Sequence, residues 1–276
     1  MAVTDIYHIG GNLKPSRKSI AFIDSDHDDY IQVNAAAVAL VTSNDTTSSF
    51  TAWINIANTV GNFTIIGAGD DNVVEFLELN IEAGLLTLRI TDATVVQVVT
   101  QADGNNLEAH RWYHVGVVQP ADGTGPRLYI NGIRIAATND TSTDVDSWWA
   151  ELDGIDTMRI GAANKAGNAT VTNDFRGGIS DVKIWQKIMS DQEMIDDAEG
   201  KSNTTSLHNH WDWNDDFVDA GTGADNGTSV GDVILINVYS EFTSRLRHLT
   251  GSPVVADTLV IWGDSSAAHA VVIQAA

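Results

Sequence analysis

Residues 151–156, with the sequence Glu-Leu-Asp-Gly-Ile-Asp, come closest to a catalytic pair of carboxylates. Retaining glycosidases hold two carboxyl groups about 5–5.5 Å apart as nucleophile and acid/base. A strand with the pattern Glu-x-Asp-x-x-Glu is one way to place such a pair on one face. This segment ends in Asp, contains a glycine and reads as a turn before the strand at 158–160. We interpret it as a polar loop and expect the protein to have no catalytic residues and not to be an enzyme.

Two histidines and an aspartate alternate along a second segment. His208, His210 and Asp212 would share one face of a strand, where they could hold a transition metal. Trp211 and Trp213 would occupy the opposite face. A strand with one buried aromatic face explains this pattern with the histidines in solvent, so we predict no metal here.

Trp148 and Trp149 are adjacent aromatic residues in a polar stretch. Successive side chains of a strand point to opposite faces, so one sheet could not bury both. One of them could therefore stack on a sugar ring, and we take the pair as the candidate glycan-binding residues. The alternative is that one indole is buried and the other covers a sheet edge.

Composition excludes several classes of protein. The 276 residues carry a formal charge of −22 and no cysteine. Such a charge repels nucleic acid and anionic membranes, and we expect neither nucleic-acid binding nor membrane insertion. The lack of cysteine suits a reducing compartment. Residues 1–7 show neither the basic start nor the apolar run of a signal peptide, so we expect no export signal.

Short segments of alternating hydrophobicity recur from residue 19 onward, with turn residues between them. In residues 49–56, for example, Phe50, Ala52, Ile54 and Ile56 share one face. We predict an all-β fold of antiparallel strands packed as two sheets. Only one helix is expected: residues 190–193 form a capping box, Ser-Asp-Gln-Glu, at its start.

The order of these segments resembles the laminin G-like, concanavalin A-like jelly roll, which pentraxins share. The resemblance is carried by segments at 29–33 (DYIQV), 49–54 (SFTAWI), 110–117 (HRWYHVGV), 127–132 (RLYING), 160–161 (IG) and 175–185 (FRGGISDVKIW). It implies a jelly-roll domain over residues 19–200, after an N-terminal arm at 1–18.

Residues 201–276 are expected to form a C-terminal β extension that completes or flanks the sandwich. Within it, 207–214 and 219–228 resemble the tryptophan strand and glycine loop common in laminin G-like proteins. In those proteins this segment often precedes the jelly roll, whereas here it follows.

The resemblance also raises the question of calcium. Pentraxin-like sites use an Asp-Asn pair, which Asp71 and Asn72 match, and a Glu-x-Asp element, where this chain has Ala163 and Lys165. The pentraxin-type site is therefore not expected. A single-ion site of the laminin G kind at Asp70, Asp71 and Asn72 stays open beside a plain turn. No cofactor is required by the sequence, and calcium is compatible with it.

Two functions are compatible with these features. We predict a non-enzymatic virion protein of a bacteriophage: a capsid decoration, head-fibre or tail-associated subunit, assembled in the host cytoplasm. Its expected partners are capsid or other virion proteins, further copies of itself, and host surface glycans. The alternative is a cellular carbohydrate-binding lectin or adhesin domain.

Overall fold

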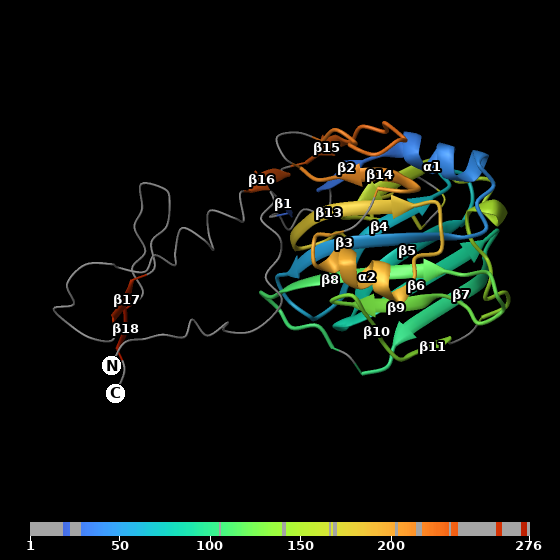
Figure 1. The fold of residues 1–276 in the computed structure, drawn as a ribbon. Helices are drawn as coiled ribbons and strands as arrows, with labels where there is room; N and C mark the ends of the chain where they lie inside the picture. Colours follow the sequence, from blue (N-terminus) through green and yellow to red (C-terminus); the bar gives the residue numbers. More distant parts are fainter. Residues whose placement is uncertain are drawn as a thin grey trace.

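The computed structural model describes residues 19–22, 29–104, 106–139, 142–165, 167, 170–201, 204–213, 217–231, 233–236, 258–260 and 272–274. The predicted arm at 1–18 and most of 237–276 lie outside the described residues. Within the described part, two antiparallel sheets pack face to face, as Figure 1 shows. The predicted all-β sandwich is therefore confirmed.

Sheet A has the strand order β10-β9-β8-β3-β13-β1-β16, and β14 also pairs with β13. Its strands are β1 (Ser19–Phe22), β3 (Ser48–Ile56), β8 (Trp112–Gln119), β9 (Arg127–Ile130), β10 (Ile133–Arg134), β13 (Gly177–Trp185), β14 (Leu207–Trp211) and β16 (Ile234–Ile236).

Sheet B has the order β11-β7-β6-β5-β4-β12-β2-β15. Its strands are β2 (Tyr30–Gln32), β4 (Asn62–Gly69), β5 (Phe76–Glu82), β6 (Leu85–Asp92), β7 (Val95–Ala102), β11 (Ala137–Asn139), β12 (Thr157–Ile160) and β15 (Thr228–Val230). A separate ladder joins β17 (Thr258–Val260) to β18 (Val272–Gln274).

Two late strands pair with the two earliest described strands: β16 pairs with β1, and β15 pairs with β2. β14 pairs with β13, the strand that precedes it in the chain. The loop after β14 covers its outer edge, because the amides of Ala220, Thr222 and Gly223 donate to carbonyls of that strand. Residues 207–236 thus contribute strands to both sheets.

The main core lies between the sheets and follows the period-two pattern. Phe50, Ala52 and Ile54 of β3 face it, as do Leu77 and Leu79 of β5. The residues between them point to the outer faces of their sheets. A second apolar cluster lies on the outer face of sheet A beneath α2 (Asp191–Ala198), which Figure 1 shows across the front of that sheet.

Two α-helices occur in the described residues, one more than expected. The predicted helix is confirmed as α2, and its capping box joins Ser190 and Glu193 reciprocally. The unexpected one is α1 (Asn34–Thr42), which lacks a side-chain cap and buries Ala36, Ala37 and Leu40. Residues 35–41 (AAAVALV) form an apolar run whose length would also suit a strand. None of the described helices is long and apolar enough to cross a membrane.

Candidate functional site

Trp148 and Trp149 are core residues, which corrects their assignment as exposed glycan-binding residues. Their exposed fractions are 1% and 0%. Trp148 is extended and immediately precedes a short 3-10 helix, η1 (Trp149–Glu151), so the two are not successive residues of one strand. Both rings pack against Phe50, with centroids 5.4 and 5.8 Å away. The alternation rule fails here because the backbone turns between them.

Asp70, Asp71 and Asn72 form a turn at the end of β4. Asp70 Oδ1 accepts hydrogen bonds from the backbone amide (2.5 Å) and side chain (3.1 Å) of Asn72. Asp71 Oδ1 accepts from Asn164 Nδ2 at 2.6 Å. Among the described residues, no group of three or more His, Cys, Asp or Glu side chains is arranged to hold a metal. The two alternatives of the sequence analysis, a plain turn and a single-ion calcium site at these residues, both stay predictions.

Further carboxylates lie near this turn: Glu75 directly before β5, and Asp153 and Asp156 in the loop before β12. Burial raises the pKa of Glu75, and the charges of Asp92, Asp153 and Asp70 add to the rise against a hydrogen bond from Gly154. Burial and the charge of Asp71 likewise raise the pKa of Asp156. This acidic end of the sandwich is therefore under electrostatic repulsion.

The outer face of sheet B carries a continuous set of hydrogen-bonding side chains. On β5, Glu78, Asn80 and Glu82 alternate with the core residues Leu77, Leu79 and Ile81. The same alternation places Thr87 and Arg89 of β6 on this outer face, beside Asn80 and Glu78 in the strand register.

One row of this face crosses five strands and consists of neutral polar residues only. The strand registers pair Thr64 with Asn80, Asn80 with Thr87, Thr87 with Gln101, and Gln101 with Thr138. We call these five residues the polar row. Thr64, Asn80 and Thr87 are fully buried, Gln101 is half-buried and Thr138 is exposed. The accessible end of the row therefore lies on β7 and β11.

The buried end of the row lies under the connection between β12 and β13. Arg159 Nη1 donates to the carbonyls of Ala163 (3.1 Å) and Thr170 (3.2 Å). Asn173 Nδ2 and Lys165 Nζ both donate to Glu78, each at 2.9 Å. These contacts fix the connection over β4 and β5, so a ligand would meet the β6–β7–β11 side of the face.

The two glutamates of β5 are held by cations. Glu78 is fully buried and pairs with Lys165, while Glu82 accepts a bidentate pair of hydrogen bonds from Arg89. Burial favours the neutral form of Glu82, but hydrogen bonds from Arg89 and Asn80 outweigh it and hold its pKa below the ordinary value. Glu82 is therefore not arranged as a proton donor at neutral pH.

A buried charge cluster on the outer face of sheet A fastens α2. Asp197 lies 2.9 Å from His114 Nε2 and 2.6 Å from Lys183 Nζ, which also contacts Asp181 at 3.0 Å. His210 Nε2 lies 2.7 Å from Asp181 and is half-buried, so it pairs with a carboxylate instead of standing in solvent. All these groups support α2 and β14, and we assign them a structural role.

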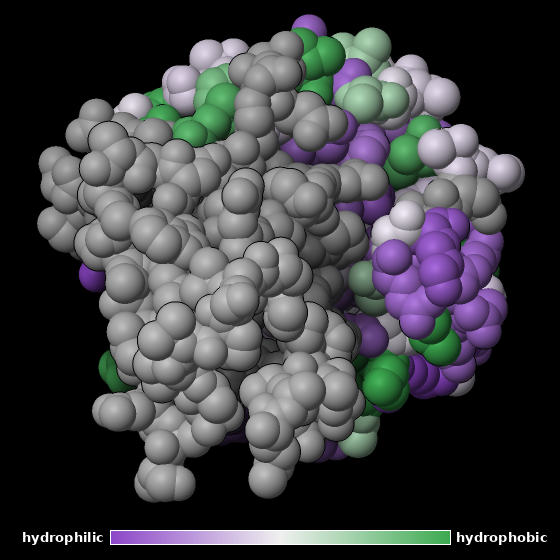
Figure 2. Space-filling view, turned by 60° about the vertical axis from the view of Figure 1, so that its left-hand side comes forward, coloured by the Kyte–Doolittle hydropathy of each residue, from purple (hydrophilic) through white to green (hydrophobic). Residues whose placement is uncertain are grey.

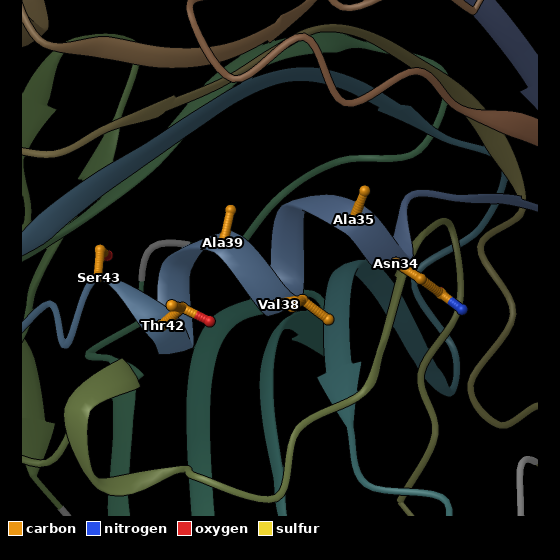
Figure 3. A pocket seen from close by; sticks show the side chains of 6 residues that line it. All are labelled: Asn34, Ala35, Val38, Ala39, Thr42 and Ser43. Atoms are coloured by element: carbon orange, nitrogen blue, oxygen red, sulfur yellow. The ribbon is translucent and has the colours of Figure 1, made fainter.

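A shallow hollow follows α1 and is lined by Asn34, Ala35, Val38, Ala39, Thr42 and Ser43 (Figure 3). All six residues come from one helix and its C-terminal cap, so the hollow has no opposing wall. We do not treat it as a site.

The fold and the outer face of sheet B define the class of this protein: a jelly-roll sandwich with a polar outer sheet face. The chain belongs to the concanavalin A-like lectin/glucanases superfamily, whose family model matches residues 24–194 of the 276. The comparison with curated proteins found no match.

Several solved structures share the fold at low sequence identity. The carbohydrate-binding module CBM40 of the Ruminococcus gnavus IT-sialidase, bound to α2,3-sialyllactose, is 14% identical with a TM-score of 0.53, over 68% of this chain and 100% of that one. A candidate carbohydrate-binding protein from Bacteroides ovatus is 18% identical with a TM-score of 0.52, over 82% of this chain and 60% of that one. A pentraxin from Limulus polyphemus is 13% identical with a TM-score of 0.48, over 82% of this chain and 91% of that one.

The sequence patterns considered above did not identify the polar row. The alternation of Leu77, Leu79 and Ile81 with Glu78, Asn80 and Glu82 is visible in the sequence and could have indicated a polar outer face on β5. The row itself depends on registers among five strands, which no local pattern specifies.

Proposed function

We propose that this protein is a non-catalytic, lectin-like module that binds a carbohydrate on the outer face of sheet B. The observation that carries the proposal is the polar row. Its amides and hydroxyls are the groups that hydrogen-bond sugar hydroxyls, since each can donate or accept. The accessible residues of the row, Gln101 and Thr138, are paired on adjacent strands about 5 Å apart at the usual strand spacing, so they would contact one sugar unit.

The comparisons support this proposal at the level of fold. Two structures that share the sandwich are a carbohydrate-binding module in complex with a sialylated trisaccharide and a candidate carbohydrate-binding protein. Their similarity to this chain concerns the fold, so the ligand and the binding face are our proposal. They favour the carbohydrate-binding alternative of the sequence analysis over the virion role, for which neither they nor the described structure provides an observation.

The two glutamates of β5, each of which is paired with a cation, support binding without hydrolysis. A glycosidase needs one carboxyl group that stays protonated near neutral pH to act as the general acid. Glu82 has the opposite character, because Arg89 and Asn80 stabilise its ionised form. Glu78 is enclosed by Lys165, Asn173 and Thr64. We therefore keep the non-enzymatic assignment as part of the proposal.

The test uses the accessible end of the polar row. The wild-type protein should bind members of a glycan array, and Gln101→Ala should weaken the affinity about five- to tenfold, which is the contribution of one hydrogen bond. Isothermal titration calorimetry with the best array ligand gives the dissociation constants.

The matched control is Gln192→Ala on α2, an exposed residue on the other side of the sandwich. It should leave the affinity unchanged. Equal losses in both variants, or a wild-type protein that binds no glycan, would contradict the proposal. Thermal unfolding of each variant separates lost binding from lost folding.

A further inference from the structure

The outer face of sheet B contains cationic side chains that are all engaged within the protein. Arg89 Nη2 donates to Glu82 Oε2 at 2.6 Å, and Lys165 Nζ donates to Glu78 Oε2 at 2.9 Å. Arg159 is buried, donates to two backbone carbonyls and lies 4.8 Å from the ring of Tyr30. Each cationic side chain that the described structure places on this face thus already binds a carboxylate or backbone carbonyls of the protein.

The accessible end of the face is neutral or negative. Gln101 and Thr138 are neutral, and Thr138 Oγ1 donates to the carboxylate of the exposed Asp103 at 2.8 Å. The whole chain carries a formal net charge of −22, which also disfavours the approach of an anion. A sugar carboxylate or sulfate brought here would lose hydration without gaining a cationic partner, and it would approach Asp103.

Stacking is also a minor contribution on the described surface. The large hydrophobic side chains that are exposed there are Val and Ile residues, and Tyr30, Trp112 and Phe217 are half-buried. In the one view of Figure 2, which is not centred on the outer face of sheet B, the coloured residues include hydrophilic areas and smaller groups of hydrophobic residues. Recognition would then depend on hydrogen bonds to hydroxyl groups.

We infer that the ligand of this face is a neutral glycan, and that sialylated or sulfated glycans are disfavoured. The inference rests on the proposed function and names the substrate class of the same site. The ligand inferred for this chain thus differs in charge from sialyllactose, which is bound to the module that shares its fold.

The experiment compares matched glycans on one array: neutral backbones and the same backbones carrying sialic acid or sulfate. Neutral members should bind at least about tenfold more tightly, because like-charge contact disfavours the acidic ones. Raising NaCl from about 50 to about 500 mM should change the neutral affinity less than about twofold, since no ion pair forms with the ligand.

The variant Glu82→Gln removes the carboxylate that neutralises Arg89. It should shift the ratio of acidic to neutral binding at least about fivefold toward acidic glycans, since an uncompensated guanidinium attracts a carboxylate. The matched control is Glu108→Gln, which removes the exposed carboxylate paired with the half-buried Arg111 elsewhere on the molecule. That variant should leave the ratio unchanged.

The outcomes distinguish the two proposals. Glycan binding with a preference for sialylated or sulfated members overturns the inference and leaves the proposed function standing. Absence of binding to every member overturns both. If Glu82→Gln does not fold, the array preference and the salt dependence of the wild-type protein decide the question.

Discussion

Asp197 is an almost fully buried carboxylate whose ionised form depends on its neighbours. Burial alone would raise its pKa, but the hydrogen bond from His114 and the charge of Lys183 outweigh burial and hold the pKa well below the ordinary value. Burial also opposes the charged form of Lys183, but Asp181 and Asp197 outweigh burial and hold the pKa of Lys183 above the ordinary value. Removing the Asp197 carboxylate would leave the buried Lys183 with Asp181 alone and would remove the acidic partner of His114.

We expect Asp197→Asn to reduce the free energy of unfolding at pH 7 by about 3–5 kcal/mol. The folded-state pKa of Asp197 is lowered, so its stabilisation is present above the unfolded-state pKa, about 4, and is lost as the pH falls further. The variant should therefore show a weaker loss of stability below pH 4 than the wild type. Urea unfolding at several pH values measures both effects. Asp196→Asn, on the same helix, is the control, and an equal response of the two variants would contradict the prediction.

Asp156 should have the opposite effect on stability. The side chain is exposed, but partial desolvation and the charge of Asp71 raise its pKa, so its ionised form opposes folding slightly at neutral pH, and this cost disappears as the pH falls through its folded pKa. Asp156→Asn can keep the hydrogen bond from the Asp71 amide through its own oxygen. We expect the Tm to rise by about 1–3 °C at pH 7 and to be unchanged at about pH 3. A Tm lowered at pH 7 would show that the carboxylate stabilises this end.

At the scale of elements, the two helices differ in how the sequence specifies them. α2 begins at a capping box, a local signal in which Ser190 and Glu193 satisfy each other's backbone amides. α1 begins after Val33 without a side-chain cap. Contacts made by the fold support it instead: Asn34 Oδ1 accepts from the Met158 amide at 3.1 Å, and its buried face joins the main core. Tertiary packing thus stabilises a segment that local signals leave undecided.

The loops at the acidic end provide a direct test for calcium. The turn at residues 70–72 and the loop before β12 bring several carboxylates together, but the oxygens of Asp70 and Asp71 already accept hydrogen bonds from Asn72 and Asn164. We therefore expect millimolar CaCl2 to raise the Tm no more than NaCl of equal ionic strength. A larger rise, abolished by Asp71→Asn, would instead establish a calcium site at this turn.

At the scale of the whole molecule, the virion role predicted from sequence has its own measurement. Quantitative peptide mass spectrometry on purified virus particles from the source culture compares this chain with the major capsid protein. A decoration subunit should appear in hundreds of copies, and a fibre or tail component in a few to a few dozen. Absence from the particles would contradict the virion role and leave the carbohydrate-binding proposal unaffected.

The pairing of late strands with earlier ones is also a property of the whole molecule. β14, β15 and β16 come late in the chain, yet they pair with β13, β2 and β1 respectively. Residues 207–211 alternate as the sequence suggests, with Leu207, Asn209 and Trp211 buried. Asp219 then orders the loop beyond them, since its carboxylate accepts hydrogen bonds from the amides of His210, Gly221 and Asp225.

Local patterns in the sequence were enough to predict the class of fold, the strand segments of the jelly roll and the start of α2. These features depend on period-two alternation and on residues three positions apart, so a local pattern contains them. The burial of Trp148 and Trp149, the existence of α1 and the polar row were decided only by the tertiary structure. Each depends on contacts between distant segments: two indoles meeting Phe50, a helix docked beside β12, and five strands in register. Register is a long-range property, because a shift of one residue would turn every side chain of a strand to the other face.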